Sequence, residues 1–264
     1  MRQYLDMLRK IYEHGTRKHP TRAESGQTVN ETRGLPNMSF NHDLRDGFPL
    51  VTTRHVPWLG CVGELRTFLL GQTRQSDFEA NGCRFWKPWA NKMPGGNLGP
   101  VYGRQWNNHG QLDHVLDCLR NRPTDRRMVV SAWRPDEHSL MVIPPCHLLW
   151  DVTVYDGAVN LAWIQRSCDW VLGVPINIAS YALLAHLLAK WAYMKPGNLA
   201  CLFCDCHIYE NQEIGVYEWL QREPMPPPEI DVWFDDDNDF NSWHAELRNW
   251  NPMPNDIDFG DVEV

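Results

Sequence analysis

The fold is decided by residues 146–194, whose sequence is CHLLWDVTVYDGAVNLAWIQRSCDWVLGVPINIASYALLAHLLAKWAYM. Residues 146–155 and 158–166 are short runs rich in β-branched and aromatic side chains, a composition typical of strands. Asp156-Gly157 lies between them and favours a type I′ turn, because both residues tolerate positive φ angles. This part of the chain therefore predicts a β-hairpin.

A buried helix is expected soon after the hairpin. Residues 177–194 are apolar nearly all round, so no polar face is left for solvent. His186 and Lys190 argue against a membrane span. Strand character is also present in residues 128–133 and 199–209. We predict an α+β fold in which a mixed β-sheet packs against this long, buried central helix.

The remaining segments complete one predicted domain. Hydrophobic spacing predicts helices at residues 2–14, 58–70, 111–121 and 243–248. Residues 16–45 are polar with little periodicity, and residues 84–108 are rich in Gly, Pro and aromatic side chains, as in a loop that shapes a pocket. No internal repeat or linker divides the chain, so residues 1–264 are expected to form a single domain.

The charges are unevenly distributed along the chain. The 264 residues carry 25 Lys and Arg against 33 Asp and Glu, a net charge of −8. Residues 230–264 hold ten of the acids and one base, Arg248, so the remainder is close to neutral. A general nucleic-acid binder has a basic surplus on the domain that contacts phosphates. Nucleic acid is therefore not an expected partner, and any anion bound here is expected to be small.

The sequence also indicates the compartment. Its first residues, MRQYLDMLRK, lack the apolar core of a signal peptide, and no run of 18 or more apolar residues is free of charge. We expect a cytoplasmic protein with no membrane partner. Its eight Cys residues are then expected to be free thiols rather than disulfides.

One of these thiols, Cys146, is a candidate nucleophile. It follows Pro144 and Pro145 at the start of the predicted hairpin and precedes His147. A thiolate is far more nucleophilic than a thiol, and nearby positive charge lowers the pKa of a cysteine. A buried structural cysteine is the alternative interpretation of the same position.

Two groups of arginines could bind an anion. Arg166 lies in QRSCD, residues 165–169, where a predicted strand ends. Arg126 and Arg127 are adjacent, and two neighbouring guanidinium groups repel each other unless an anion lies between them. An ordinary ion pair at Arg166 and a solvated Arg126-Arg127 pair are the alternative interpretations.

Two segments resemble metal sites at first sight. The first could supply four zinc ligands: Cys201, Cys204, Cys206 and His207. Side chains alternate along a strand, however, so Cys204 and Cys206 are expected on one face and the other two on the opposite face. The acidic run WFDDDND, residues 233–239, lacks the Gly and the spacing of a calcium loop and is predicted to be a solvated turn. No metal is therefore expected.

Several longer motifs, in this order along the chain, resemble the folate-dependent thymidylate synthase family. They are DGFPLVTT at 46–53, GELRTFLLG at 63–71, FWKPWA at 85–90, LGPVYGRQW at 98–106, DRRMVVSAW at 125–133, PPCH at 144–147, QRSCDWVLGVPINIASYALLAH at 165–186 and DCHIYENQ at 205–212. The motifs span nearly the whole chain, which makes the resemblance much more specific than any single motif.

The resemblance implies a homodimer whose interface is one face of the sheet. It implies that the substrate is 2′-deoxyuridine 5′-monophosphate (dUMP) and that the co-substrate is 5,10-methylenetetrahydrofolate. Cys146 would add to C6 of the pyrimidine, and the products would be thymidine monophosphate (dTMP) and dihydrofolate. The other implied catalytic residues are Glu64, Tyr102, His147 and Asn177.

The resemblance also implies two sets of binding residues. The phosphate and sugar of dUMP would be bound by Arg22, Arg166, Ser167, Asp169, His207 and Tyr209, with Arg126 and Arg127 contributed by the partner subunit. The folate side would be formed by Arg54, Trp86, Asp169, Leu172, Gly173 and Val264, with Arg54 meeting the glutamate tail.

Asn177 determines which base is expected. A carboxamide can donate to O4 and accept from N3–H of uracil, whereas relatives that act on cytosine nucleotides carry Asp at this position. The resemblance therefore favours a uracil nucleotide as the substrate.

Some positions depart from the family pattern. The phosphate loop differs at residues 21–28, Thr67 replaces Trp, Phe203-Cys204 replaces Gly-Gly, Cys206 replaces Thr and Glu263 replaces Ala. These changes keep a sister activity open, dUMP hydroxymethylase, in which water instead of hydride ends the reaction and yields 5-hydroxymethyl-dUMP and tetrahydrofolate. A non-catalytic nucleotide- or RNA-binding module is disfavoured, because the nucleophile and its proton-transfer partners are all present.

Overall fold

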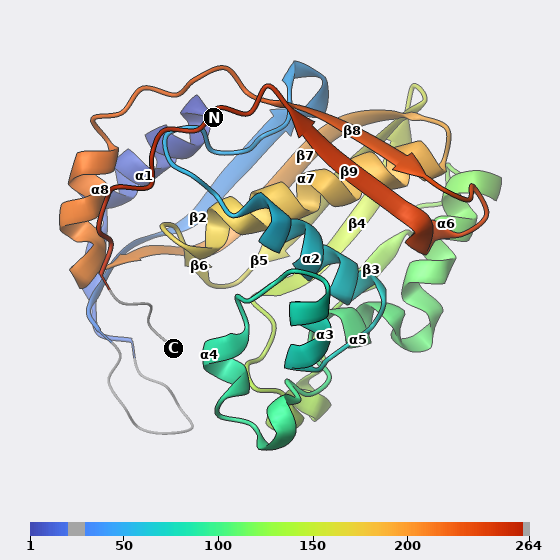
Figure 1. The fold of residues 1–264 in the computed structure, drawn as a ribbon, viewed down its shortest axis with the longest axis horizontal. Coiled ribbons are helices and arrows are strands. Elements are labelled where there is room, and N and C mark those ends of the chain that lie inside the picture. The colour runs from blue at the N-terminus through green and yellow to red at the C-terminus, as the bar shows by residue number, and fades with distance from the viewer. Residues whose placement is uncertain (21–29, 261–264) are drawn as a thin grey trace.

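The computed structural model describes residues 1–20 and 30–260, and its centre is a seven-stranded sheet (Figure 1). The strand order is β1-β2-β7-β5-β4-β3, and β6 also pairs with β7. The bounds are β1 Thr16–Lys18, β2 Thr32–Asp43, β3 Val129–Ser131, β4 His147–Tyr155, β5 Ala158–Gln165, β6 Cys168–Asp169 and β7 Lys195–Tyr209. β5 and β6 run parallel to β7, and the other pairs are antiparallel, so the predicted mixed sheet is confirmed.

The β4–β5 hairpin forms as the sequence predicts. Asp156 and Gly157 have φ angles of 51° and 70°, the left-handed values that a type I′ turn requires at both central positions. Tyr155 and Ala158 pair directly across this turn. The turn therefore fixes the register of the two strands that lead to Cys146 and Arg166.

The long helix α7, Gly173–Trp191, lies across one face of the sheet (Figure 1). Tyr181 stacks on Trp163 of β5, with ring centroids 4.6 Å apart and ring planes 15° apart. A second helix, α2 (Trp58–Leu69), packs against α7. Because α7 is covered by both the sheet and α2, its side chains are buried nearly all round, and the predicted central helix is confirmed.

Shorter helices surround this core. Their bounds are α1 Arg2–His14, α3 Gln75–Ala80, α4 Lys87–Ala90, α5 Tyr102–Asn107, α6 Gln111–Asn121 and α8 Glu213–Trp219. Short 3-10 helices occur at Leu44–Asp46, Pro94–Gly96, Asn108–Gly110, Pro135–Leu140, Glu210–Gln212 and Phe240–Ser242. The loop predicted at 84–108 contains α4 and α5, which are too short to leave a periodic pattern. Among the described helices, none is long and apolar enough to cross a membrane.

Residues 16–45, for which the sequence predicts no helix or strand, contain the long strand β2. β2 pairs with β7 over nearly its full length, whereas β1 covers its other edge only opposite residues 32–34. Pro36 therefore lies where that edge has no neighbouring strand in the described ranges, and an edge tolerates proline because no N–H is required there. Asn37 follows with a φ of 53°. Both residues break the alternation that would have revealed the strand.

The helix predicted at residues 243–248 is wrong. This segment is β9, Trp243–Arg248, which pairs antiparallel with β8, Glu229–Phe234. Its Ala, Glu, Leu and Arg residues are good helix formers, but differences in helix propensity are below about 1 kcal/mol per residue, and pairing overrides them. The acidic residues 235–239 are exposed in the loop between the two strands, as the predicted turn requires.

The sheet face opposite α7 carries a row of apolar side chains. Leu149 of β4 pairs with Ile164 of β5, which pairs in turn with Leu202 of β7. Leu202 is 40% exposed, and Val129 of the edge strand β3 is 42% exposed. No element in the described ranges covers this row, and an uncovered apolar face on a sheet commonly marks an interface.

Candidate active site

Cys146 lies directly before β4, where the chain enters the sheet. Its backbone N–H donates to the Tyr102 hydroxyl at 2.8 Å, which holds the start of α5 against this residue. The residue as a whole is half-buried. Burial raises the pKa of Cys146, whereas the Arg166 guanidinium and a hydrogen bond with Tyr102 act to lower it. Cys146 is thus partly exposed, and its thiol lies beside groups that favour the thiolate.

Arg166 is held beside Cys146 by backbone carbonyl groups. Its backbone N–H donates to the Cys146 carbonyl at 2.8 Å. Its guanidinium donates to the carbonyls of Pro145 at 2.9 Å and Pro144 at 2.7 Å. These partners are neutral, so the alternative of an ion pair with a carboxylate is not seen among the described residues. The positive charge of Arg166 therefore remains available for an anion.

His147 lies between two tyrosine rings on the inner side of β4. The ring centroids of Tyr102 and Tyr181 are 5.0 and 5.3 Å from that of the imidazole. Desolvation lowers the pKa of His147 to about 4, although a hydrogen bond with Asn177 acts to raise it. The imidazole is therefore neutral at pH 7 and contributes hydrogen bonds rather than charge.

Asn177, in the second turn of α7, has its amide fixed by β5. Nε2 of Gln165 donates to Asn177 Oδ1 at 2.9 Å, and Oε1 of Gln165 accepts from Trp163 Nε1 at 3.2 Å. Gln165 is buried, so this chain of bonds gives the Asn177 carboxamide a defined orientation. Gln165 was not among the site residues predicted from the sequence. The available signal was a polar side chain at an inward position of an otherwise apolar strand.

Glu64 is a buried acid on α2. It is 6% exposed, and Oε1 accepts a hydrogen bond of 2.9 Å from Trp86 Nε1. Desolvation raises the pKa of Glu64 to about 7, while the bond from Trp86 acts in the opposite direction. A carboxyl group with a pKa near neutrality can both donate and accept a proton at physiological pH.

A small cavity of about 10 Å³ lies between Glu64 and His147, and Leu65, Phe68 and Trp106 contribute to its lining. Ser180 and Tyr181 of α7 also line it, and the sequence analysis identified neither residue. Their hydroxyl groups and His147 Nδ1 have no hydrogen-bond partner among the described residues. A single water needs about 10–15 Å³ and two to four polar partners. The surface that this cavity exposes is apolar, so it does not offer a water these partners, and Glu64 and His147 share only its lining.

Asp169 and the residues that follow it form the start of α7. Oδ1 of Asp169 accepts from the backbone N–H groups of Val171 and Leu172, each at 3.0 Å. Burial raises the pKa of Asp169, and these two bonds act to lower it. A Cβ atom at Gly173 would lie 3.7 Å from Asn177 Oδ1 and 3.8 Å from Asp169 Cβ. Gly173 thus keeps the space between these two polar side chains open.

His207 and Tyr209 lie on β7 beside Asp169. Asp169 pairs with His207 across β6 and β7, and the rings of His207 and Tyr209 meet edge to face with centroids 5.3 Å apart. His207 Nδ1 donates to the Asp205 carbonyl at 3.1 Å. Hydrogen bonds from His207 and Lys18 lower the pKa of the Asp205 carboxyl to about 2. The strand pairing therefore connects these residues to the segment that contains Arg166 and Ser167.

Arg54 has an unexpected environment. It is only 7% exposed, its guanidinium donates to the Val171 carbonyl, and it lies 4.5 and 5.1 Å from the rings of Trp219 and Phe259. Burial lowers its pKa. The side chain thus supports the Asp169 segment from beneath Phe259 and does not face solvent, so its contact with a glutamate tail stays a prediction.

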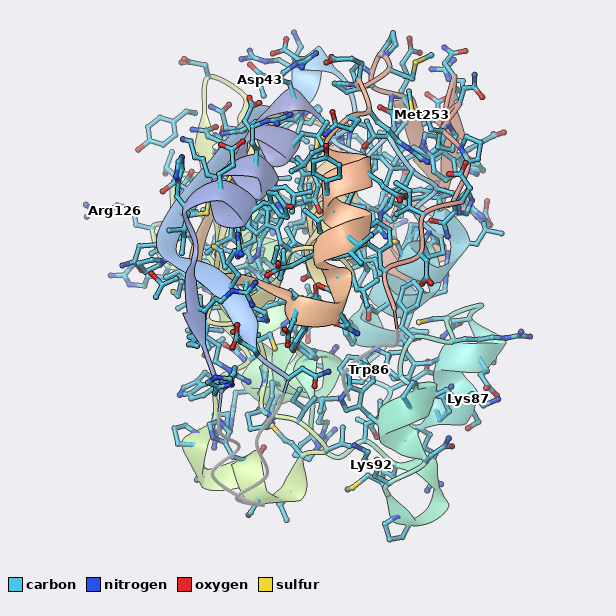
Figure 2. The ribbon with its side chains drawn as sticks, turned by 90° about the vertical axis from the view of Figure 1, so that its left-hand side faces the viewer. Asp43, Trp86, Lys87, Lys92, Arg126 and Met253 are labelled. Atoms are coloured by element: carbon cyan, nitrogen blue, oxygen red, sulfur yellow. The ribbon has the colours of Figure 1, made fainter. Side chains whose placement is uncertain are left out.

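The other expected phosphate ligands are less constrained. Arg126 and Arg127 are both exposed, and Figure 2 shows Arg126 projecting from the edge of the molecule opposite Lys87. Neither side chain forms a hydrogen bond with the site residues in the described ranges. Trp86, by contrast, lies inside the fold in the same view. Arg22 and Val264, which the sequence places in the site, lie outside the described residues.

The thiol-rich end of β7 is less regular than the strand pattern predicts. Cys201 and Cys206 are both buried, while Cys204 and Asp205 are both partly exposed, so the expected alternation is wrong beyond Phe203. The pairing of β2 with β7 skips Asn37, whose positive φ interrupts the ladder there. Within the described residues, no three His, Cys, Asp or Glu side chains are grouped to hold a metal ion.

Comparison with known proteins gives a consistent result. A family model described as thymidylate synthase matches residues 2–259. Thymidylate synthases from three strains of Coxiella burnetii, Dugway 5J108-111, RSA 331 / Henzerling II and RSA 493 / Nine Mile phase I, are each 36% identical over 264 aligned residues. Each alignment covers 96% of this chain and 97% of the relative. The similarity thus includes every element that contributes to the site.

Proposed function

The chain belongs to the thymidylate synthase family, and on this premise we propose that Cys146 is the nucleophile that adds to C6 of dUMP. The reaction of the family transfers the one-carbon unit of 5,10-methylenetetrahydrofolate to C5 of dUMP, giving dTMP and dihydrofolate. One observation carries the assignment of Cys146: the thiol of this half-buried residue lies beside the Arg166 cation and is hydrogen-bonded to Tyr102.

The first step is the attack of Cys146 as a thiolate. Arg166 favours that form, because a cation beside a thiol lowers its pKa. Formation of the S–C6 bond moves electron density onto C5 and O4 of the pyrimidine. Protonated Glu64, which lines the same cavity as His147, supplies hydrogen bonding to O4. In this proposal Tyr102, whose hydroxyl accepts from the Cys146 N–H, helps to remove the C5 proton.

Ser167 and Arg166 bind the phosphate in this proposal, with Arg126 and Arg127 of the partner subunit and Arg22. His207 and Tyr209 bind the sugar hydroxyl, and Asp169 contributes at the start of α7. Strand pairing supports this assignment, because Asp169, three residues after Arg166, lies opposite His207. Four guanidinium groups also suit a phosphate dianion.

We expect Asn177→Asp to change the base that the enzyme accepts. Gln165 donates to Oδ1, and a carboxylate keeps that acceptor but loses the N–H₂ donor that O4 of uracil requires. The expected result is a fall of about 100-fold in kcat/KM for dUMP, together with measurable turnover of dCMP. Steady-state assays with both nucleotides test this. Unchanged preference for dUMP would show that Asn177 does not contact the base edge.

The residues present fit a folate beside the pyrimidine. Trp86 offers an indole fixed by Glu64, and Gly173 leaves open the space bordered by Asp169 and Asn177. Leu172, Arg54 and the C-terminal Val264 complete the proposed folate side. When bound, the folate supplies the one-carbon unit and the hydride. The protein's part is to orient it over the nucleotide and exclude water.

The proposed enzyme is a homodimer formed through the uncovered sheet face. The row of Leu149, Ile164 and Leu202 is apolar and in register, and a two-fold related copy would bury it. Arg126 and Arg127 precede β3, the outermost strand of that sheet, and are exposed. This position suits donation of both side chains into the site of the partner subunit.

A complementation experiment tests this sharing of the site. We expect the double variant Arg126→Glu/Arg127→Glu and the variant Cys146→Ala each to be inactive as homodimers. After subunit exchange at equal amounts, half of the dimers are mixed, and each has one intact site, so activity should recover to about a quarter of wild type. If the arginines acted within their own subunit, no activity would return.

The hydroxymethylase alternative gains no support from Thr67. Its hydroxyl donates to the Gly63 carbonyl at 2.7 Å and accepts from Asn81 Nδ2 at 3.0 Å. Thr67 is fully buried, so both hydrogen-bonding partners are provided within the protein. It does not hold a water at the reacting carbon. Glu263, the other position that motivated the alternative, lies outside the described residues.

We further propose that the protein is cytoplasmic and that it requires no nucleic acid. All eight cysteines are free thiols, which is typical of a reducing compartment. The direct test of the proposed activity is to mix the purified protein with dUMP and methylenetetrahydrofolate and to follow dihydrofolate by its ultraviolet absorbance. A rise that requires both substrates is expected, and no rise would contradict the proposal.

A further inference from the structure

Three buried thiols lie outside the proposed reaction. They are Cys168, Cys201 and Cys206, and each is less than 5% exposed. Cys168 and Cys206 are direct partners in the register of β6 and β7. Cys201 lies earlier on β7, opposite Trp163.

The register places the first two thiols within disulfide reach. Neighbouring strands lie about 4.8 Å apart, and disulfides join Cα atoms that are about 4.4–6.8 Å apart. Register partners on adjacent strands also direct their side chains to the same face. The Cys206 thiol is close enough to Cys168 to act with burial in raising the pKa of Cys168. Each thiol also lies near a carbonyl three residues earlier, 3.4 Å from that of Gln165 and 3.5 Å from that of Phe203.

We propose that Cys168 and Cys206 form a reversible disulfide when the protein meets a two-electron thiol oxidant of the diazene class. In the first step one thiolate adds to the N=N bond of the oxidant. The second thiolate then attacks that sulfur, an S–S bond forms and the S–N bond breaks. The two thiols lose two electrons and two protons in total, and the diazene leaves as a hydrazine that has gained both.

Burial sets the rate of this reaction. Desolvation, together with the nearby Cys206 thiol, raises the pKa of Cys168, and thiolate is the reactive form. The pair is therefore oxidised more slowly than the half-buried Cys146. β6 is only two residues long, so opening this strand exposes the pair without unfolding the sheet.

The consequence for substrate binding rests on the proposed function. Cys168 lies between Ser167 and Asp169, and Cys206 directly precedes His207. When the two thiols close to an S–S bond of about 2.05 Å, we expect Ser167, Asp169 and His207 to shift by about 1 Å. A displacement of that size in a binding site is costly. Oxidation should therefore weaken dUMP binding about tenfold, and reduction should restore it.

The experiment uses Cys146→Ser protein, so that the thiol of this partly exposed residue does not react. The protein is treated with diamide, alkylated under denaturing conditions and digested with trypsin. Intact mass should fall by about 2 Da, and peptide 167–190 should be joined to peptide 191–222. Because the second peptide holds three cysteines, the treatment is repeated in Cys201→Ser and Cys204→Ser variants, where the link should persist. It should disappear in Cys206→Thr and Cys206→Ala.

The outcomes separate the disulfide from the function. The proposed Cys168–Cys206 disulfide is contradicted if both thiols are alkylated after full diamide treatment, or if Cys168 is joined to Cys201 or Cys204. Calorimetric titration of dUMP into reduced and oxidised protein then tests the effect. Equal affinity with the bond present would overturn the proposed coupling to the site. Absence of dUMP binding by the reduced protein would instead count against the proposed function and leave the mass result standing.

Discussion

Replacing Cys146 with Ala is expected to reduce the conversion of dUMP to dTMP by at least about 10⁴-fold. The S–C6 bond is the step that makes C5 reactive, and among the described residues no other thiol is hydrogen-bonded to Tyr102 or flanked by the Arg166 guanidinium. Binding of dUMP should change by less than about threefold, since Arg166 is oriented by backbone carbonyls that remain. Single-turnover kinetics and calorimetry measure the two quantities separately.

Cys204→Ala is the matched control for this variant. Cys204 is also partly exposed, but it lies on the open side of β7 and contacts none of the proposed catalytic groups. Its removal should leave kcat/KM within about twofold. Turnover by Cys146→Ala above about one part in a thousand of wild type would show that the reaction does not pass through this adduct.

Glu64→Gln is expected to lose activity and gain stability at the same time. The amide cannot transfer a proton, so kcat should fall by about 100-fold or more. The folded protein holds Glu64 at a pKa of about 7 against an ordinary value of 4.5. Between these values the folded state binds more protons than the unfolded state, so the contribution of Glu64 to stability is full below pH 4.5 and is lost as pH rises through 7.

The magnitude follows from the two pKa values. At about 1.4 kcal/mol for each pH unit between them, ionised Glu64 costs the folded state about 3 kcal/mol at pH 8. Denaturant unfolding should therefore find the Gln variant more stable than wild type by up to that amount at pH 8, with little difference at pH 4.5. A stability difference that does not change with pH would show that Glu64 is not desolvated as described.

The elements that could be predicted from the sequence are those whose residues are determined by one local cause, either turn chemistry or burial on every side. The hairpin around Asp156-Gly157 and helix α7 are examples, because local turn chemistry and all-round burial each leave a clear pattern. β2 was not predicted, since Pro36 and Asn37 interrupt it at an edge that β1 leaves uncovered. β9 was predicted as a helix, because only its pairing with the distant β8 overrides its composition.

The site residues could be predicted only partly from their local sequence. Cys146 and Arg166 were candidates from local context, but family resemblance was needed to bring them together with Glu64 and Asn177. Single-sequence reasoning missed the supporting residues Gln165 and Ser180, because a buried polar side chain cannot be distinguished from an exposed one until its partners are known. The burial of Arg54 could not be predicted from its local sequence either, because it depends on contact with Phe259 in the distant C-terminal segment.

We propose that this chain converts dUMP and methylenetetrahydrofolate to dTMP through Cys146. The most direct measurement is mass-spectrometric identification of both products after incubation of the purified protein with the two substrates. We expect dTMP and dihydrofolate in equal amounts from the wild-type protein, and neither product from Cys146→Ala. Formation of 5-hydroxymethyl-dUMP with tetrahydrofolate would contradict the proposal, because water rather than hydride would then have ended the reaction.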